Sequence, residues 1–130
     1  MPVKVDPKAI PRSYREYLEK MVEMGEFFEI DEEVDWNLEM GAICMRASET
    51  GAPSPIFNNV KDSPEGFRAA EVGYQKSGTP GRDWVKVAVQ LGMPPDSGII
   101  EMQHAYNEVM ENGTVHPPKI IENKDACLLY

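Results

Sequence analysis

The sequence predicts an α+β domain in which a small mixed β-sheet, containing one βαβ unit, packs with about four helices. Three observations support this fold class. Four segments carry apolar residues at helical spacing, and each is followed by a glycine. Residues 27–60 have the order strand, helix, strand over the length of a βαβ unit. The 11 prolines and 10 glycines lie between the periodic segments, where they mark element boundaries rather than a disordered linker.

The first predicted helix covers residues 13–24. Ser13 and Glu16 have the spacing of a capping box, and apolar residues recur at helical intervals after them. Gly25 supplies the left-handed residue that ends this helix. The β-prone run at 26–30 then predicts a strand with an acidic, solvated exit.

Asp35 is expected to cap a second helix that runs to Thr50 and ends at Gly51. Its apolar side is narrow, which predicts close packing on a sheet, and consists of Leu38, Ala42, Met45 and Ser48. Residues 55–60 predict the next strand, parallel to the first with a right-handed crossover. Residues 67–74 alternate in part, which predicts an antiparallel return strand.

Two further helices are predicted after a glycine-rich stretch. Thr79 and Pro80 suit the N-cap and first position of a third helix, whose apolar face is Trp84, Val87, Ala88 and Leu91. The fourth helix is expected from Asp96 and Ser97 to residues 112–113, with an apolar face of Ile99, Met102, Tyr106, Val109 and Met110. Residues 119–121 and 126–130 form two final apolar runs.

Composition excludes several classes of protein. The 130 residues, 42% hydrophobic and 27% charged, are typical of one soluble domain, and no apolar run approaches the ~20 residues that span a bilayer. A net charge of −9 has the wrong sign for neutralising phosphates, so neither nucleic acid nor an anionic membrane is expected as a partner. Two cysteines are too few for a disulfide framework, and the N-terminus lacks an apolar signal region, so we expect a reducing cytoplasm.

Residue types that bind metals or act as bases are present but lack the required spacing. Six acidic residues cluster along the chain: Glu26, Glu29, Asp31, Glu32, Glu33 and Asp35. They do not fit an EF-hand loop, and a solvated acidic loop is the preferred interpretation. His104 is expected on a helix and His116 in a loop, without metal-ligand spacing. Cys44 and Cys127 form no Cys-x-x-Cys motif and are expected to be core thiols.

The glycine-rich stretch offers only a loose match to a phosphate loop. Gly73, Gly78 and Gly81 accompany Lys76 and Ser77, but the Gly-Lys-Ser/Thr ending is absent. No Gly-x-Ser-x-Gly elbow is present to start a Ser-His-Asp hydrolase. Residue chemistry alone therefore predicts no catalytic, cofactor-binding or metal-binding residue.

The linear order of three stretches is nevertheless distinctive. Residues 14–30 are followed by Glu-Val-Asp-Trp-Asn-Leu-Glu-Met-Gly-Ala-Ile at 33–43 and by Pro-Ile-Phe-Asn-Asn-Val-Lys at 55–61. In this order they resemble the N-terminal domain of the UbiD family, decarboxylases of aromatic and α,β-unsaturated acids that use prenylated flavin mononucleotide (FMN). Residues 84–95, 97–111 and 116–121 look like the segments by which such enzymes approach their cofactor domain. The resemblance covers residues 12–130.

This resemblance implies a single N-terminal UbiD-like domain over residues 1–130, with an extended arm at 1–11 and a flexible loop at 75–81. Residues 114–130 would lead toward a cofactor domain absent from the chain. The complete enzyme would use prenylated FMN with a divalent metal and potassium, none of them bound by this chain alone. The family's catalytic residues and ligands lie in the absent part, so no residue here inherits such a role.

We therefore expect a docking role beside the flavin-binding and C-terminal oligomerisation domains, in cis or in trans, within an oligomeric UbiD-like (de)carboxylase. The chain would be a fragment, a separate subunit or a stand-alone domain, and it is not expected to be active alone. The alternative is an autonomous acidic interaction module without catalysis. A small carboxylate-based hydrolase lacks any motif. The sequence does not specify the substrate acid or the physiological direction of the reaction.

Overall fold

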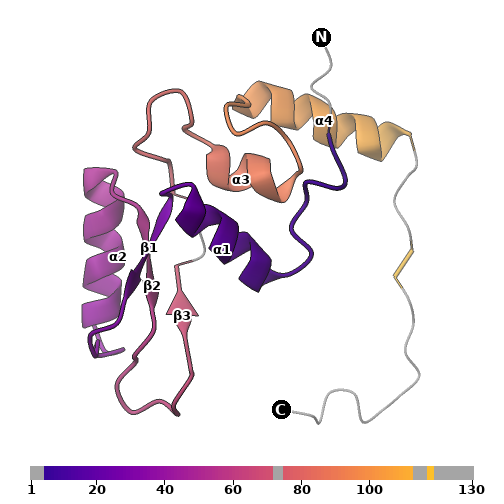
Figure 1. Cartoon of the computed structure of the whole chain (residues 1–130). Helices are drawn as coiled ribbons and strands as arrows, with labels where there is room; N and C mark the ends of the chain where they lie inside the picture. The colour runs from indigo at the N-terminus through magenta and orange to yellow at the C-terminus, as the bar shows by residue number, and fades with distance from the viewer. Residues whose placement is uncertain (1–4, 72–74, 113–116, 119–130) are drawn as a thin grey trace.

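The computed structural model describes residues 5–71, 75–112 and 117–118. The elements in chain order are α1 (Tyr14–Glu23), β1 (Phe27–Ile30), α2 (Glu39–Thr50), β2 (Ser54–Phe57), β3 (Ala69–Ala70), α3 (Val85–Gln90) and α4 (Ile99–Glu111). Figure 1 shows α2 on one side of the sheet, α1 on the other, and α4 beyond α3 on the side away from the sheet. The predicted α+β class is confirmed.

The sheet has the order β1-β2-β3. β1 and β2 are parallel, with Phe27 opposite Ser54, whereas β2 and β3 are antiparallel, with Ile56 opposite Ala70. Both predicted pairings are confirmed, although each strand is shorter than expected. An isolated parallel bridge between Val34 and Val60 continues the β1–β2 pair beyond the strands. The right-handed crossover stays a prediction.

Successive residues of β2 join hydrophobic cores on opposite faces of the sheet. Ile56 lies in a cluster with residues of α1, β1 and α3: Tyr17, Met21, Phe27, Val85 and Val89. Phe57 lies in a second cluster with Val34 and Val60, against which part of α2 packs. A third cluster joins α3 to α4 through Ala88, Met93, Met102 and Ala105. The first two cores therefore hold the helices on the sheet, and the third holds α4 on α3.

α1 agrees with its sequence signals. The Ser13 hydroxyl accepts a hydrogen bond from the backbone N–H of Glu16 at 3.2 Å, as an N-cap does. The Glu16 carboxylate accepts from the N–H of Arg12 rather than from Ser13, so the capping box is only half formed. Gly25 has φ +74°, which confirms its predicted left-handed role.

α2 begins three residues later than predicted, with Leu38 rather than Asp35 at the N-cap position, because Asp35 forms a turn instead of a cap. The carboxylate of Asp35 accepts from the N–H of Asn37 at 2.9 Å, and that of Glu39 accepts from the N–H of Asp35 at 2.8 Å. Only after Leu38, whose φ is +71°, does the chain become helical. The predicted stop at Gly51, with φ +66°, is confirmed.

The predicted apolar side of α2 is wrong. Its members are all exposed: Leu38, Ala42, Met45 and Ser48. The helix instead packs on the core through the adjoining side, with Ala47 buried and Met40, Ile43 and Cys44 partly buried. This side of α2 packs against Phe57 because its apolar side chains bury more apolar area there than those of the predicted side would.

α3 is also shorter than predicted and begins at Val85 rather than near Thr79. Thr79 lies in a turn closed by the N–H of Arg82, and its hydroxyl donates to the Glu26 carboxylate at 3.4 Å. The predicted face of α3 does reach the α3–α4 core, with Ala88 buried. The opposite face is buried too, since Val85 and Val89 join the core on the sheet.

α4 begins at Ile99, after an N-terminal turn in which the Gly98 N–H donates to the Glu101 carboxylate at 2.8 Å. The expected start near Asp96 and Ser97 is therefore too early. Met102 is buried as predicted, but the rest of the predicted apolar face is about half exposed: Ile99, Tyr106, Val109 and Met110. The α3–α4 core is too small to cover the whole face.

The N-terminal arm contacts the chain at Gly92, just after α3. The N–H of Asp6 donates to the Gly92 carbonyl at 2.9 Å, and Val5 packs against the α3–α4 core. Gly92 has φ +67°, and a Cβ there would lie 2.5 Å from the Asp6 carbonyl oxygen, so the contact requires glycine.

Several expectations lie outside the described residues: the start of the arm at 1–4, part of the return strand at 72–74, and the apolar runs 119–121 and 126–130. The proposed flexibility of 75–81 and the lead-out role of 114–130 stay predictions. Among the helices of the described part, none combines the length and apolar character needed to cross a membrane.

Candidate functional site

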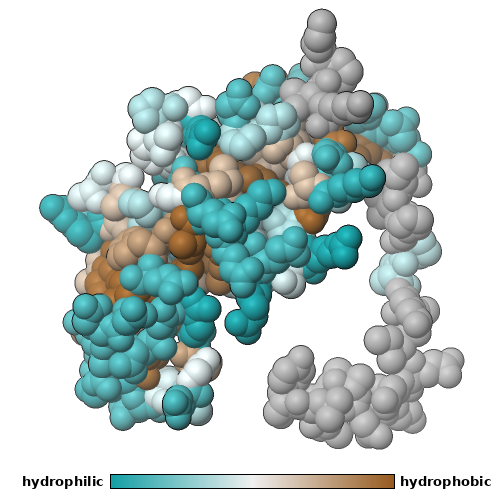
Figure 2. Space-filling model, in the orientation of Figure 1, coloured by the Kyte–Doolittle hydropathy of each residue, from teal (hydrophilic) through white to brown (hydrophobic). Residues whose placement is uncertain are grey.

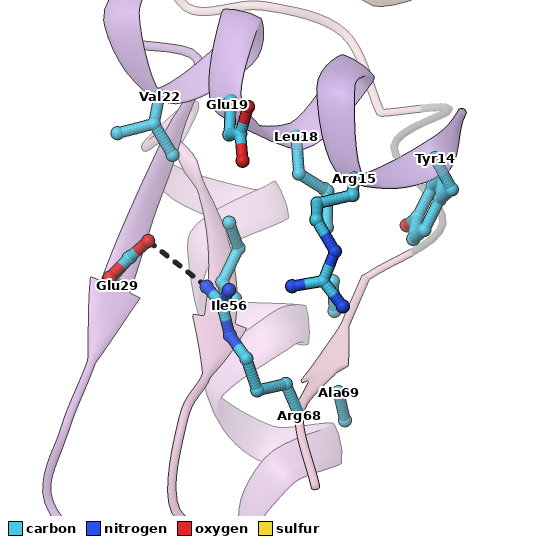
Figure 3. A pocket seen from close by; sticks show the side chains of 10 residues that line it. Tyr14, Arg15, Leu18, Glu19, Val22, Glu29, Ile56, Arg68 and Ala69 are labelled. Carbon is cyan, nitrogen blue, oxygen red and sulfur yellow. Dashed lines mark hydrogen bonds and ion pairs between the residues drawn. The ribbon is translucent and has the colours of Figure 1, made fainter. Parts of the chain in front are cut away.

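A cleft of about 290 Å³ opens between α1 and the sheet. Its apolar lining includes Leu18 and Val22 of α1 and Ile56 of β2. Figure 3 shows Arg15 reaching down from α1 toward Arg68, which extends from the start of β3 toward Glu29 of β1. The cleft therefore combines an apolar lining with a charged rim.

On one side of the cleft, the charged groups of the rim form an ion pair with each other. The guanidinium of Arg68 lies 3.0 Å from the Glu29 carboxylate, and its Nε donates to Asn58 Oδ1 at 2.6 Å. The amide of Asn58 donates in turn to Glu29 and Asp31. Two guanidinium groups and two carboxylates, those of Glu19 and Glu29, line the cleft, so their charges balance. The arrangement suits polar recognition of another surface better than activation of a substrate.

A buried polar cluster connects α3 to the start of β2. Lys86 is only 2% exposed, and its ammonium group donates to the Ser54 hydroxyl at 2.8 Å and lies 5.3 Å from the Phe27 ring centroid. Burial lowers the pKa of Lys86, and the nearby carboxylates of Glu26 and Glu71 oppose that shift. The cluster is closed to solvent, so we assign it to holding α3 on the sheet.

Glu26 belongs to the same cluster and is 3% exposed. Its carboxylate accepts from the hydroxyl of Ser77 at 2.9 Å, which ties the 75–81 stretch to the sheet. Two buried acceptors, Glu71 Oε2 and Gln75 Oε1, have no hydrogen-bond partner among the described residues. The interior here is therefore polar enough to accommodate ordered water.

The turn before α2 holds a strained and exposed leucine. Leu38 has φ +71° and ψ −39°, and the N–H of Glu39 donates across it to the Asn37 carbonyl at 3.0 Å, which is a γ-turn. The ion pair between Lys61 and Asp35, 2.7 Å apart, anchors this turn. It lowers the pKa of Asp35 and raises that of Lys61, mainly through the hydrogen bond between them. The turn displays Leu38, 82% exposed, and Trp36, 62% exposed.

The sequence candidates for chemistry are mostly dispersed. In the described ranges, no three His, Cys, Asp or Glu side chains converge as metal ligands. The prediction of a solvated acidic loop is wrong for Glu26, which is buried, while Glu29 and Asp35 form surface ion pairs. His104 is exposed on α4, and Cys44 is half-buried on the sheet side of α2, where burial raises its pKa.

The remaining candidates divide between loop and undescribed chain. Ser77 is buried and Lys76 forms an exposed ion pair with Asp83 at 3.2 Å, so the stretch is used for packing. Gly73, His116 and Cys127 lie outside the described residues. Sequence reasoning missed Lys86, although a charged residue inside the apolar run Val-Lys-Val-Ala-Val could have marked it.

Comparison with known proteins identifies the family. Residues 18–106 match the model described as the 3-octaprenyl-4-hydroxybenzoate carboxy-lyase N-terminal domain, UbiD_N. The match covers more than half of the chain and includes the second half of α1, the sheet, α2, α3 and the first half of α4. The chain belongs to the UbiD family.

Curated relatives agree with this assignment. The chain is 33% identical over 95 residues to ferulic acid decarboxylase 1 of Candida dubliniensis, covering 68% of this chain and 18% of the relative. It is 33% identical over 85 residues to pyrrole-2-carboxylic acid decarboxylase of Pseudomonas aeruginosa, covering 65% and 17%. It is 28% identical over 124 residues to ferulic acid decarboxylase 1 of Saccharomyces cerevisiae, covering 88% and 23%. The chain therefore spans less than a quarter of the length of these UbiD relatives.

A solved structure shows the same fold. Vanillic acid decarboxylase of Sedimentibacter hydroxybenzoicus, in an open form, superposes with a TM-score of 0.59 at 20% identity. The superposition covers 72% of this chain and 18% of that one. The architecture described above therefore also occurs within that decarboxylase.

Proposed function

We propose that this chain is the N-terminal domain or subunit of a UbiD-like (de)carboxylase acting on aromatic or α,β-unsaturated carboxylic acids. Its role is structural: it docks beside the part that binds prenylated FMN. One observation carries this proposal. The chain matches decarboxylases of ferulic and pyrrole-2-carboxylic acid, yet corresponds to only 18% and 17% of their length.

The described residues do not fit the implied cofactor or its metal. The cleft beside α1 has balanced charges, whereas an FMN phosphate requires a surplus of donors or positive charge. Acidic and histidine side chains of the described ranges do not gather as a metal site. When bound, prenylated FMN would supply the electron sink for loss of carbon dioxide, and we derive no step of that chemistry from this chain.

The exposed apolar surfaces support docking. Large apolar side chains are exposed on α4, and Trp36 and Leu38 are exposed at the turn before α2. Apolar groups gathered in this way mark contact surfaces for other polypeptide. The implied partners are the flavin-binding and C-terminal oligomerisation domains of the same enzyme, in an oligomer of the cytoplasm.

A fusion tests the proposal. The whole chain replaces the matched N-terminal region of the P. aeruginosa pyrrole-2-carboxylic acid decarboxylase, and the fusion is loaded with prenylated FMN. We expect it to retain the cofactor and to decarboxylate pyrrole-2-carboxylic acid, while the 130-residue chain alone converts none of a panel of aromatic and unsaturated acids. A fusion that folds without retaining cofactor or activity would contradict the docking role. Turnover by the chain alone would contradict the assignment of chemistry to the other part.

A further inference from the structure

One side of α4 carries a straight apolar stripe that the described residues leave uncovered. Ile99, Tyr106 and Met110 are spaced i, i+7 and i+11, so they lie on one face of the helix over about 16 Å. Their exposed fractions are 53%, 57% and 53%. Met102 and Ala105 bury the adjoining side against α3. Figure 2 shows hydrophobic side chains reaching the surface in the region of α4.

The charges of α4 indicate what kind of surface would cover this stripe. Ile99–Glu111 contains no lysine or arginine, and its last turn has no basic residue. Glu108 and Glu111 instead lie near the carboxyl end, where the helix dipole favours positive charge. A covering surface with lysine or arginine near this end would offset an unfavourable local field. The complementary surface is therefore an apolar groove with a basic rim.

The size of the stripe indicates how the partner is held. An aromatic side chain buries roughly 150–250 Å² when fully covered and isoleucine or methionine less, so the three half-exposed side chains offer at most about 300 Å². A stable interface between free proteins takes about 800 Å² from each partner. The stripe alone is too small for a freely diffusing partner or a second copy. It is sufficient for polypeptide tethered nearby, because a short linker maintains a millimolar effective concentration.

The UbiD relatives supply such a tethered partner. This chain matches the N-terminal domain of proteins of which it spans only 17 to 23%, so most of the relative's chain follows the matched region. We propose that the Ile99–Tyr106–Met110 stripe of α4 docks into an apolar, basic-rimmed groove of the polypeptide that follows this domain in a UbiD-like decarboxylase. This inference rests on the proposed function and adds the docking surface to it.

Hydrogen exchange on the fusion described above tests the stripe. We expect amides of α4 to exchange at least about tenfold more slowly in the fusion than in the 130-residue chain, with little change in α2. Met110→Ser should abolish most of this protection. Met45→Ser is the matched control, since Met45 is also an exposed methionine, 63% exposed on α2 against 53% for Met110 on α4. It should leave the protection of α4 unchanged.

Charge reversal adds a readout that a purely structural role would not move. Glu111→Lys should weaken the protection of α4 in the fusion if the groove has a basic rim, although the same change favours the isolated helix. If the amides of α4 are not protected from exchange in a fusion that is cofactor-loaded and active, the proposal for the stripe is wrong and the proposed function still holds. If Met45→Ser removes the protection and Met110→Ser does not, the proposal is wrong and the docking surface lies on α2. A dimer of the chain alone, lost on Met110→Ser in light scattering, would assign the stripe to a second copy and overturn it as well.

Discussion

α1 and α4 show the same apolar periodicity in sequence but differ in how much of their apolar face is buried. Both carry apolar residues at helical spacing, and both end at a glycine or asparagine boundary. α1 buries Tyr17 and Met21 against the sheet and α3. α4 is three residues longer, yet buries only Met102 and Ala105. Helical periodicity therefore identifies an apolar face, but it does not show whether the same chain covers it.

The difference arises from what lies opposite each helix. α1 faces a β-sheet, which presents Phe27 and Ile56 as a continuous apolar surface. Among the described residues, α4 packs on the short helix α3, on Met93 just after it and on the N-terminal arm, which contribute small apolar groups such as Ala88 and Val5. A two-turn helix cannot cover the four turns of α4. The four predictions below test this contrast, starting with the largest expected effect.

Loss of a methionine side chain should be costly on α1 and not on α4. Met21 is fully buried, so Met21→Ala should lower the free energy of unfolding by about 2–5 kcal/mol. Met110 is half exposed, so Met110→Ala should change it by no more than about 0.5 kcal/mol. Urea unfolding of the two variants measures both values. Equal losses would show that α4 is covered within this chain, which breaks the contrast.

Lys86 should make the stability of the sheet side depend on alkaline pH. Burial lowers its pKa below the ordinary 10.5, so the folded protein binds this proton less tightly than the unfolded chain. Unfolding then takes up a proton just below pH 10.5, and through this residue stability rises with pH across that range. Lys86→Met should remove this rise in stability with pH. It should also lower the free energy of unfolding by about 2 kcal/mol at neutral pH, because the Ser54 hydroxyl loses a hydrogen-bond donor and the Glu26 carboxylate loses a nearby cation.

The pH experiment has an internal control at the surface. Lys61→Met removes a lysine whose pKa is raised by its hydrogen bond to Asp35. Its contribution has the opposite sign: it is present at neutral pH and is lost as pH rises through the folded pKa. Chemical denaturation over the alkaline range compares both variants with the unsubstituted chain. If Lys86→Met retains the alkaline rise, the residue is not held as a buried ammonium.

Leu38 should be exposed for a reason different from that of the α4 stripe. Its φ of +71° disfavours every residue with a Cβ, and at 82% exposure the side chain contributes no packing. Leu38→Gly should therefore raise the free energy of unfolding by about 1 kcal/mol. Leu38→Ala, which keeps a Cβ, should give no such gain. Thermal unfolding of both variants measures the difference. A gain from alanine equal to that from glycine would show that side-chain exposure, and not backbone strain, sets the cost.

Reversing the charge at the carboxyl end of α4 should increase the stability of the chain. Glu111→Lys is expected to stabilise the chain by about 0.3–1 kcal/mol at low salt, because a cation there complements the helix dipole. Glu111→Gln, which only removes the negative charge, should give a smaller gain. The gain should fade as salt screens the interaction. Destabilisation at low salt would mean that positive charge within this chain already faces the end of α4.

Much of the fold was predictable because its signals are local. Ser13 and Gly25 bounded α1 correctly, and Gly51 ended α2, since caps and left-handed glycines act within one turn of helix. The short spacing between two β-prone runs gave the parallel pair. The start of α2 was missed because Asp35 can bond to Asn37 in a turn as readily as to a helical N–H, and the sequence contains both options.

The candidate surfaces were harder to predict. Residue chemistry alone predicted no catalytic site, whereas the resemblance to the UbiD family was predicted and is confirmed by the family match. The buried Lys86 was not foreseen, because its burial depends on Ser54 and Glu26, which lie far away in sequence. Leu38 was predicted to pack on the sheet and instead projects from a γ-turn.

The sequence by itself determined which segments are helices and strands, where most helices stop, that the sheet is mixed, and which family the chain resembles. Only the tertiary structure decided which side of α2 meets the sheet, that Lys86 enters the interior, and that the described part of the chain leaves the stripe of α4 uncovered. The physical reason is range. Caps, turns and periodicity act over a few residues, whereas burial depends on the total apolar area that distant segments bring together.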